Sequence, residues 1–294
     1  MESSFIKKSI AAFLGFAIGD AFGATTEFMT KKEIEVKYGK LKSIVGGGWL
    51  HLKPGKVTDD TEMSIALARS IVDNKSFSQK IVADYFLKWM QSKPVDIGNT
   101  IRFSLINYMK KSKYEADYDE SSAGNGALMR SVPVCIYAKG DVDVLKEIAL
   151  KQAHITHNNK LSDLAVINYC ETLNILLTGG SKIQALEKVS KFINEHKIFS
   201  FSRYKGENSG YIVDTYKAIM HFYFEGVSFK DTMIETVNNG GDSDTIGALV
   251  GALCGATYEL NSIPKKWINK LDKNVYKEIM ELTVSLCNLR VNIF

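Results

Sequence analysis

Two short stretches of the chain place carboxylates and hydroxyls where a helix is expected to begin. They are Thr58-Asp59-Asp60-Thr61 and Asp242-Ser243-Asp244-Thr245. Such residues are common N-caps, and negative charge is favourable at the positive end of a helix dipole. One capping residue is enough for that purpose. Carboxylate and hydroxyl oxygens are also the ligands that Mg²⁺ and Mn²⁺ prefer, so the two stretches together predict a site for divalent cations, whose charge would offset the repulsion between the carboxylates.

The residues after each stretch have helical spacing. Met63, Ala66, Leu67 and Ile71 recur at intervals of three and four residues after the first. Ile246, Leu249, Val250 and Leu253 do so after the second. This periodicity predicts one apolar helix face on each side of the candidate site.

Glycine recurs every fourth residue on one face of two predicted helices. The helix that follows Thr245 carries Gly247, Gly251 and Gly255. The predicted helix near the start of the chain carries Gly15, Gly19 and Gly23. Because glycine costs about 1 kcal/mol against alanine inside a helix, we expect a compensating close approach between the two backbones. A membrane dimer motif is the alternative, but the apolar run at 246–256 is shorter than the roughly 20 residues that a bilayer needs.

The first apolar segment also imitates a secretory signal. Lys7 and Lys8 precede an apolar run, and small residues follow it. Asp20 argues against this interpretation because it falls before the apparent cleavage site. We therefore expect residues 10–24 to form a core helix.

Composition favours an ordinary globular protein. The chain has 294 residues, 45% of them hydrophobic and only 4 of them proline, and no linker or repeat divides it, which predicts one domain over residues 1–294. The net charge of +4 is too mild and dispersed to indicate nucleic-acid binding. The four cysteines lie far apart and fit buried free thiols, which favours a cytoplasmic protein. We expect a monomer.

Helical periodicity dominates the chain, and the alternation typical of strands is nearly absent. An all-α fold is the prediction. Long loops at 41–57 and 196–210 are expected to line a site. The predicted helices cover residues 62–73, 79–91, 98–111, 143–153, 161–177, 182–194, 211–224, 229–237, 245–259 and 274–288.

The ordered motifs of the chain resemble those of the ADP-ribosylglycohydrolases. The motifs are GFAIGDAFGATTEF, VTDDTEMSIALA, PVDIGNT, GNGALMRSVPV, ITHNN and NGGDSDTIGALVGAL, between residues 15 and 253. Their order and the chain length look like the bacterial branch of the family that acts on dinitrogenase reductase. The resemblance implies a compact all-α fold with a cleft that holds two divalent cations, Mg²⁺ or Mn²⁺. The implied reaction is hydrolysis at C1 of the distal ribose of ADP-ribose, acting on an ADP-ribosylated protein and releasing ADP-ribose.

The resemblance also assigns roles to residues of this chain. The implied metal ligands are Thr58, Asp59, Asp60, Asp242, Asp244 and Thr245. Asp96 matches an aspartate near the scissile ribose, with N-capping of the next helix as the alternative. Glu27 matches a glutamate at the cleft entrance, with a surface position as the alternative. Asp60, Asp96 and Glu27 are therefore the candidate catalytic residues, with two cations fixing ribose hydroxyls and making a bound water more acidic.

A glycine-containing loop matches the family segment that wraps the ribose and diphosphate. Glycines allow close approach, and backbone N–H groups can bind phosphate oxygens, although a simple turn would have the same composition. The implied substrate-binding residues are Ser121, Gly124, Asn125, Gly126 and His157. Tyr211, after Asn208-Ser209-Gly210, is a further candidate for contact with the adenosine or the acceptor. For His157 a structural role is the alternative, and for Tyr211 it is packing. Arg130 is interpreted as structural.

Two other classes of function stay open at this point. One is a non-catalytic relative that binds ADP-ribose or is purely structural, and the other is a phosphoesterase that uses the same dinuclear site. No candidate metal ligand is missing, which argues against the first. The resemblance favours arginine as the acceptor over serine, a nucleobase or a small molecule.

Overall fold

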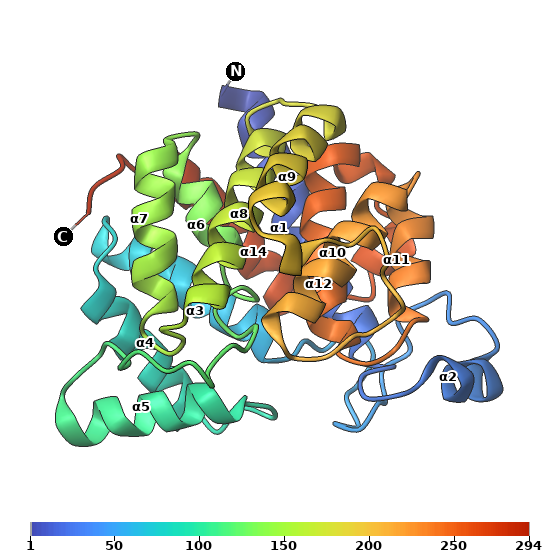
Figure 1. Cartoon of the computed structure of the whole chain (residues 1–294), viewed down its shortest axis with the longest axis horizontal. Helices are drawn as coiled ribbons and strands as arrows, with labels where there is room; N and C mark the ends of the chain where they lie inside the picture. The colour runs from blue at the N-terminus through green and yellow to red at the C-terminus, as the bar shows by residue number, and fades with distance from the viewer. Residues whose placement is uncertain (1, 294) are drawn as a thin grey trace.

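The computed structural model describes residues 2–293, and within them all regular secondary structure is helical (Figure 1). Pairing between extended segments is limited there to isolated bridges. The α-helices are α1 (Glu2–Gly23), α2 (Lys31–Tyr38), α3 (Asp59–Asn74), α4 (Gln79–Gln91), α5 (Asn99–Lys111), α6 (Val132–Ala138), α7 (Val142–Ala153), α8 (Lys160–Leu177), α9 (Lys182–Glu195), α10 (Ile212–Glu225), α11 (Phe229–Val237), α12 (Ser243–Tyr258), α13 (Lys265–Ile268) and α14 (Lys273–Asn288).

The all-α prediction is confirmed, and the predicted helices agree with the observed ones to within a few residues at each end. The largest difference is at α1, which begins at Glu2 rather than at residue 10, and α3 begins at Asp59 rather than at residue 62. The short helices α2, α6 and α13 were not predicted. Each spans too few residues for an apolar period to repeat, so periodicity alone does not reveal it.

Helices α1 and α12 pack side by side in antiparallel order, and their glycines bring the two backbones together. A Cβ atom on Gly19 would lie 2.0 Å from the carbonyl oxygen of Gly247, and one on Gly15 would lie 2.3 Å from that of Gly251. The predicted close approach is therefore confirmed. It explains the glycines without a membrane dimer, since no helix in residues 2–293 has the length and apolar character to cross a bilayer.

The central helix α1 is buried over most of its length and contacts α12, α14, α11 and α8. Residues 10–24 thus lie in the core, as the sequence predicted. The four cysteines are all free and buried, which confirms the prediction of buried free thiols. Helix α2 stands apart from this core, at the lower right of Figure 1, between two long loops.

The starts of α3 and α12 are the two stretches singled out in the sequence. Thr58 is the N-cap of α3 and Asp242 is the N-cap of α12, but neither side chain makes a capping hydrogen bond. Asp96 does not cap α5 either, because Gly98 occupies that N-cap position. Capping therefore does not account for these polar side chains.

Candidate functional site

A pocket of about 270 Å³ lies where the starts of α3 and α12 meet. Carboxylates from four separate segments share it, and no Lys or Arg is among its described lining residues. The lining residues include the carboxylates Glu27, Asp59, Asp60, Asp96, Asp242 and Asp244, together with Thr245, Gly124, Asn125, Gly126 and His157. The structure thus brings most of the residues predicted for the site into one cavity.

Asp20 fixes the start of α3 against α1. Its carboxylate is fully buried and accepts hydrogen bonds from the backbone N–H groups of Thr58 and Thr61, at 3.0 and 3.1 Å, and from the Thr61 hydroxyl at 2.5 Å. It therefore caps α3 from another helix, which leaves the carboxylates of Asp59 and Asp60 free to face the pocket.

Asp60 lies at the centre of the polar cluster. Its Oδ2 atom accepts hydrogen bonds from the hydroxyls of Thr58 and Thr245, each at 3.3 Å, so it joins the starts of α3 and α12. Its Oδ1 atom is buried and has no hydrogen-bond partner in the described residues, and the same is true of Oδ1 of Asp244. Two buried carboxylate oxygens without partners are costly, because such groups normally find a donor or a cation.

The pKa shifts of the pocket carboxylates also indicate buried negative charge without a partner. Burial raises the pKa of Asp59, Asp60 and Asp244 well above the usual range, and the neighbouring carboxylates raise it further. Burial also raises the pKa of Glu27 to about 8. This is the pattern expected when like charges are gathered in a site of low dielectric without a counter-charge from the protein.

The residues therefore fit divalent cations by their chemistry. Hard oxygen donors, an excess of buried negative charge and two unpartnered oxygens are what Mg²⁺ or Mn²⁺ would satisfy. In the described residues, no three Asp, Glu, His or Cys side chains are already arranged around one point as ligands. Asp242 is engaged by the chain itself, since its Oδ2 atom accepts a hydrogen bond from Asn125 Nδ2 at 2.6 Å.

Glu27 and Asp96 both lie in the pocket wall. Glu27 is buried, and its Oε2 atom accepts a hydrogen bond from the indole N–H of Trp49 at 2.7 Å. Asp96 is half-buried, and its Oδ1 atom accepts from the backbone N–H of Ile97 at 2.7 Å. Burial raises the pKa of Asp96 as well. Neither residue is the ordinary surface carboxylate or N-cap that was the alternative in the sequence.

The loop at 124–126 packs directly on His157. A Cβ atom on Gly126 would lie 2.7 Å from Cε1 of His157, and one on Gly124 would lie 3.1 Å from its Nε2 atom. The glycines thus allow this loop to approach the imidazole as well as the pocket. Burial lowers the pKa of His157 to about 3, which keeps the ring neutral, and its Nδ1 atom hydrogen-bonds the Thr156 hydroxyl at 2.8 Å.

Three of the predicted residues are not among the side chains that line the pocket. Thr58 is buried beneath it, and Ser121 is exposed and donates to Asp119 Oδ1 at 2.7 Å. Tyr211 is 40% exposed, and its backbone forms an isolated bridge with Gly124. Tyr211 and Ser121 therefore belong to the surrounding surface, where a bound molecule would have to extend beyond the pocket to reach them.

Arg130 supports the site from behind, as the sequence interpretation held. The guanidinium is fully buried and donates to Gln152 Oε1, to the Gln152 carbonyl and to the Thr156 hydroxyl, each at 2.8 Å. Its central carbon also lies 4.6 Å from the centre of the Phe86 ring. Arg130 therefore holds the segment that carries His157, and it does not face the pocket.

Sequence reasoning missed the residues that hold the site together. Asp20 was noted only as an obstacle to a signal peptide, yet a carboxylate inside an apolar helix face was the available signal for a buried positioning role. Phe28 and Trp49 carry no comparable signal. They lie on irregular segments, and only the structure shows that both flank Glu27.

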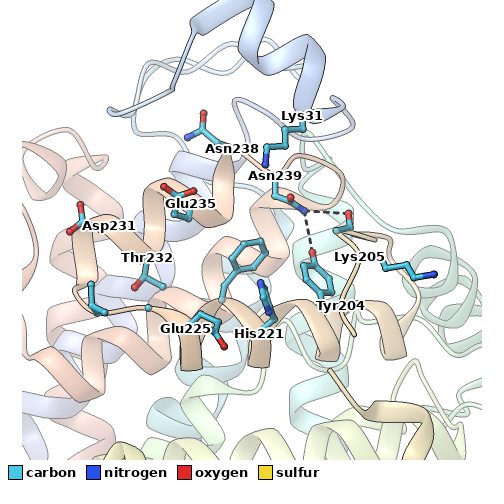
Figure 2. A pocket seen from close by; sticks show the side chains of 14 residues that line it. Lys31, Tyr204, Lys205, His221, Glu225, Asp231, Thr232, Glu235, Asn238 and Asn239 are labelled. Carbon is cyan, nitrogen blue, oxygen red and sulfur yellow. Dashed lines mark hydrogen bonds between the residues drawn. The ribbon is translucent and has the colours of Figure 1, made fainter. Parts of the chain in front are cut away.

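A second hollow, of about 470 Å³, lies between α10, α11 and the loop at 204–206, and its described lining shares no residue with the carboxylate pocket (Figure 2). In it Asn239 Nδ2 donates to the Tyr204 hydroxyl at 3.1 Å and to the Gly206 carbonyl at 3.3 Å (Figure 2). The start of α12 is tied to the same irregular segment, because the backbone N–H of Asp242 donates to the Asn208 carbonyl at 3.0 Å. This side of the molecule thus positions the backbone of Asp242.

An all-α fold with an acidic pocket between two helix starts is the architecture expected of ADP-ribosylglycohydrolases, and comparison with known proteins gives the same class. The family model of the ADP-ribosylglycohydrolases matches residues 1–292. The chain belongs to this family.

The names of similar proteins describe the hydrolysis of ADP-ribosyl groups. An ADP-ribosyl-[dinitrogen reductase] glycohydrolase of Rhodospirillum rubrum is 45% identical over 272 residues, which cover 92% of each chain. An ADP-ribosylarginine hydrolase of Pseudomonas putida is 30% identical and covers 94% of this chain and 78% of its own length. A solved chain described as an ADP-ribosylglycohydrolase-related protein complex superposes with a TM-score of 0.86 at 30% identity, covering 98% of this chain and 99% of that one.

Proposed function

We propose that this ADP-ribosylglycohydrolase removes ADP-ribose from modified arginine side chains of a protein. The bond that breaks joins C1 of the distal ribose to the guanidino nitrogen, and water supplies the oxygen that replaces it. The observation that carries the proposal is the convergence of Asp59, Asp60, Asp242 and Asp244 in one pocket. The arginine linkage is supported by the names of the relatives in Rhodospirillum rubrum and Pseudomonas putida.

Two divalent cations, Mg²⁺ or Mn²⁺, are the cofactors in this proposal. Their ligands would come from the starts of the two helices: Thr58, Asp59 and Asp60 from α3, and Asp242, Asp244 and Thr245 from α12. When bound, the cations would supply the positive charge that fixes ribose hydroxyls and makes a water molecule more acidic.

The remaining chemistry belongs to residues of this chain. Asp96 lies on the pocket wall with only one oxygen engaged by the backbone, so the other is free to exchange a proton or to face the positive charge that develops on the ribose. Glu27 is held by Trp49 through a single oxygen, which leaves its second oxygen for the water or a ribose hydroxyl.

The nucleotide part of the substrate would lie along the loop at 124–126 and His157. Gly124 and Gly126 line the pocket, so a diphosphate would lie next to the backbone of this loop. His157 is neutral because of its low pKa, so it would contact the nucleotide by packing and hydrogen bonding rather than by charge. Ser121 and Tyr211 would extend this surface. We propose further that the protein acts as a monomer in a reducing, cytoplasmic environment, which its buried free thiols support.

A linkage screen tests the proposal. The full-length protein is incubated with arginine-, serine- and nucleobase-linked ADP-ribose, in Mg²⁺ or Mn²⁺, and the products are separated by chromatography. We expect free ADP-ribose and intact acceptor, with the arginine-linked substrate hydrolysed fastest. AMP and ribose phosphate would instead indicate the phosphoesterase. Binding of ADP-ribose without turnover of any linkage would indicate a non-catalytic relative.

A further inference from the structure

Two hollows border the carboxylate pocket, and they adjoin it at different residues. One, of about 690 Å³, shares Glu27 and Phe28 with the pocket and continues over α2. The other, of about 180 Å³, shares Thr100 and reaches Thr156, beside His157. We call the first of these the α2 groove. Its described lining is Glu27, Phe28, Met29, Thr30, Lys32, Glu33, Val36, Lys37, Gly48 and Trp49.

An exposed aromatic pair stands where the pocket opens into the α2 groove. The side chains of Phe28 and Trp49 are 66% and 47% exposed, and their ring centres lie 5.3 Å apart with the rings tilted by 48°. The indole N–H of Trp49 donates to Glu27 inside the pocket. Large aromatic groups that stay exposed beside a buried acidic site are unusual, since burial would otherwise stabilise the fold.

The backbone of Phe28 is held in a strained conformation to keep its ring in this place. Its φ of 59° is in the left-handed region, which costs about 1–3 kcal/mol for such a residue. Two backbone hydrogen bonds enforce it: Phe28 N–H donates to the Gly241 carbonyl at 2.8 Å, and Gly241 N–H donates to the Met29 carbonyl at 2.9 Å. The segment that fixes Phe28 therefore leads directly into Asp242.

Trp49 is fixed from the other side by a close backbone contact. Gly48, with a φ of 68°, lies so near the residue that follows α1 that a Cβ atom there would be 2.1 Å from the carbonyl oxygen of Ala24. The positions of both rings are thus set by the same elements that set the positions of the site carboxylates. The pair is a preformed wall of the cavity.

We propose that the Phe28–Trp49 pair binds the guanidinium group of the acceptor arginine, and that the α2 groove receives the polypeptide segment that carries it. This inference rests on the proposed function. In the proposed function the acceptor is bonded to C1 of the distal ribose, next to the carboxylates, while the nucleotide lies along the loop at 124–126 and His157. The α2 groove adjoins the pocket at Glu27 and Phe28, so it is open to the acceptor. Guanidinium is planar and cationic and packs well on aromatic faces, and the buried Glu27 carboxylate lies beside this pair.

The first test changes the ring and keeps the backbone. In Phe28→Asn the aromatic face is lost, while asparagine tolerates the left-handed conformation. We expect KM for ADP-ribosyl-arginine to rise about tenfold, equivalent to about 1.4 kcal/mol, with kcat changed much less. Affinity for free ADP-ribose, measured by calorimetry, should stay within about twofold of that of the unmodified protein. Phe28→Tyr, which keeps a ring, should restore the original KM.

The second test concerns the polypeptide segment. Val36 lines the α2 groove and is 81% exposed, and Val227 is equally exposed in the separate hollow of Figure 2, which makes Val227→Asp a matched control. Val36→Asp should lower the rate on an ADP-ribosylated protein relative to free ADP-ribosyl-arginine by about fivefold or more, a loss of about 1 kcal/mol. Val227→Asp should leave that ratio unchanged.

The outcomes separate this inference from the proposed function. If the unmodified protein releases no ADP-ribose from arginine, the function itself is wrong. If it does, but KM for ADP-ribosyl-arginine is the same in Phe28→Asn, the aromatic pair does not bind the acceptor. A parallel loss of ADP-ribose affinity in Phe28→Asn would also overturn the inference, because the ring would then contact the nucleotide product. An unchanged rate ratio in Val36→Asp would remove the α2 groove from substrate binding.

Discussion

At the scale of single residues, Asp60 shows why the pocket requires partners from outside the chain. One of its oxygens joins two threonine hydroxyls, and the other is buried without a donor. A fold gains nothing from this arrangement by itself, since an unpartnered buried carboxylate is destabilising. Residues that lower stability and are held in place by their surroundings are typical of sites that bind or react.

The cation proposal can be tested through stability. Adding Mn²⁺ at about 100 times its Kd should stabilise the protein by about 2.7 kcal/mol, seen as a rise in Tm, because the cation binds only the folded state. Asp60→Asn should lose most of that rise. In EDTA the same variant should be at least as stable as the unmodified protein, since a buried charge has been removed.

The control for that experiment is Asp143→Asn, an exposed carboxylate in the first turn of α7. It should leave the response to Mn²⁺ intact. An unchanged Tm of the unmodified protein across saturating Mn²⁺ and Mg²⁺, together with no anomalous scattering peak from Mn²⁺ in crystals, would contradict the cation site.

Asp96 offers a way to separate chemistry from binding. Asp96→Asn preserves shape but removes the carboxylate that exchanges protons, so kcat should fall by about 10²–10⁴. ADP-ribose binding should persist, as measured by calorimetry. Asp60→Ala should instead lose binding and turnover together. Near-normal turnover in Asp96→Asn would leave Glu27 as the proton-exchanging residue of the chain.

At the scale of elements, the site depends on how closely α1 and α12 approach. Glycine every fourth residue was sufficient to predict this contact, because a run of costly residues on one face needs a compensating neighbour. The sequence likewise placed α3 and α12 from their apolar period. It did not reveal that Asp20, on α1, caps α3 across space, since a bond between residues so far apart in sequence leaves no local pattern.

Replacing a glycine at the contact between α1 and α12 by a larger residue should separate the two helices. In Gly19→Ala the new methyl group would lie 2.0 Å from the Gly247 carbonyl oxygen, a contact that backbone movement alone can relieve. We expect a loss of about 3 kcal/mol or more in the free energy of unfolding, measured by urea denaturation in EDTA.

Gly179→Ala is the matched control for Gly19→Ala. Nothing lies within 4 Å of a Cβ atom there, so only the strain of its φ of 96° contributes. The cost should be about 1–2 kcal/mol. Equal losses in the two variants would mean that the contact between α1 and α12 is not tight.

At the scale of the whole molecule, regular elements and irregular segments differ in how well the sequence predicts them. The helices follow from a repeating apolar period, and the metal-ligand candidates follow from the residues at helix starts. Phe28 and Trp49 lie on segments without a period, and their positions depend on backbone pairing with Gly241 and on contact with Ala24. Ser121 was assigned from a motif and Tyr211 from its position in the sequence, and neither gives the direction of a side chain.

The response of the whole molecule to pH should include a contribution from His154. This residue ends α7, and its Nε2 atom lies 2.9 Å from Oδ1 of Asp163 in the first turn of α8, with Glu115 as a more distant carboxylate at 3.9 Å. The bond to Asp163 raises the pKa of His154 above its usual value of 6.5, and partial burial opposes that rise. The pair thus links two helices beside the segment that carries His157.

The sign of the pH effect follows from this raised pKa. Because protonation is favoured in the folded state, the stabilisation is fully present below about pH 6.5 and is lost as the pH rises through the folded pKa of His154. His154→Gln should therefore reduce the free energy of unfolding by about 1 kcal/mol more at pH 5.5 than at pH 9, a value that allows for the partial exposure of the pair. Urea denaturation at the two pH values measures this difference. If His154→Gln costs the same at both pH values, the ion pair with Asp163 does not stabilise the fold.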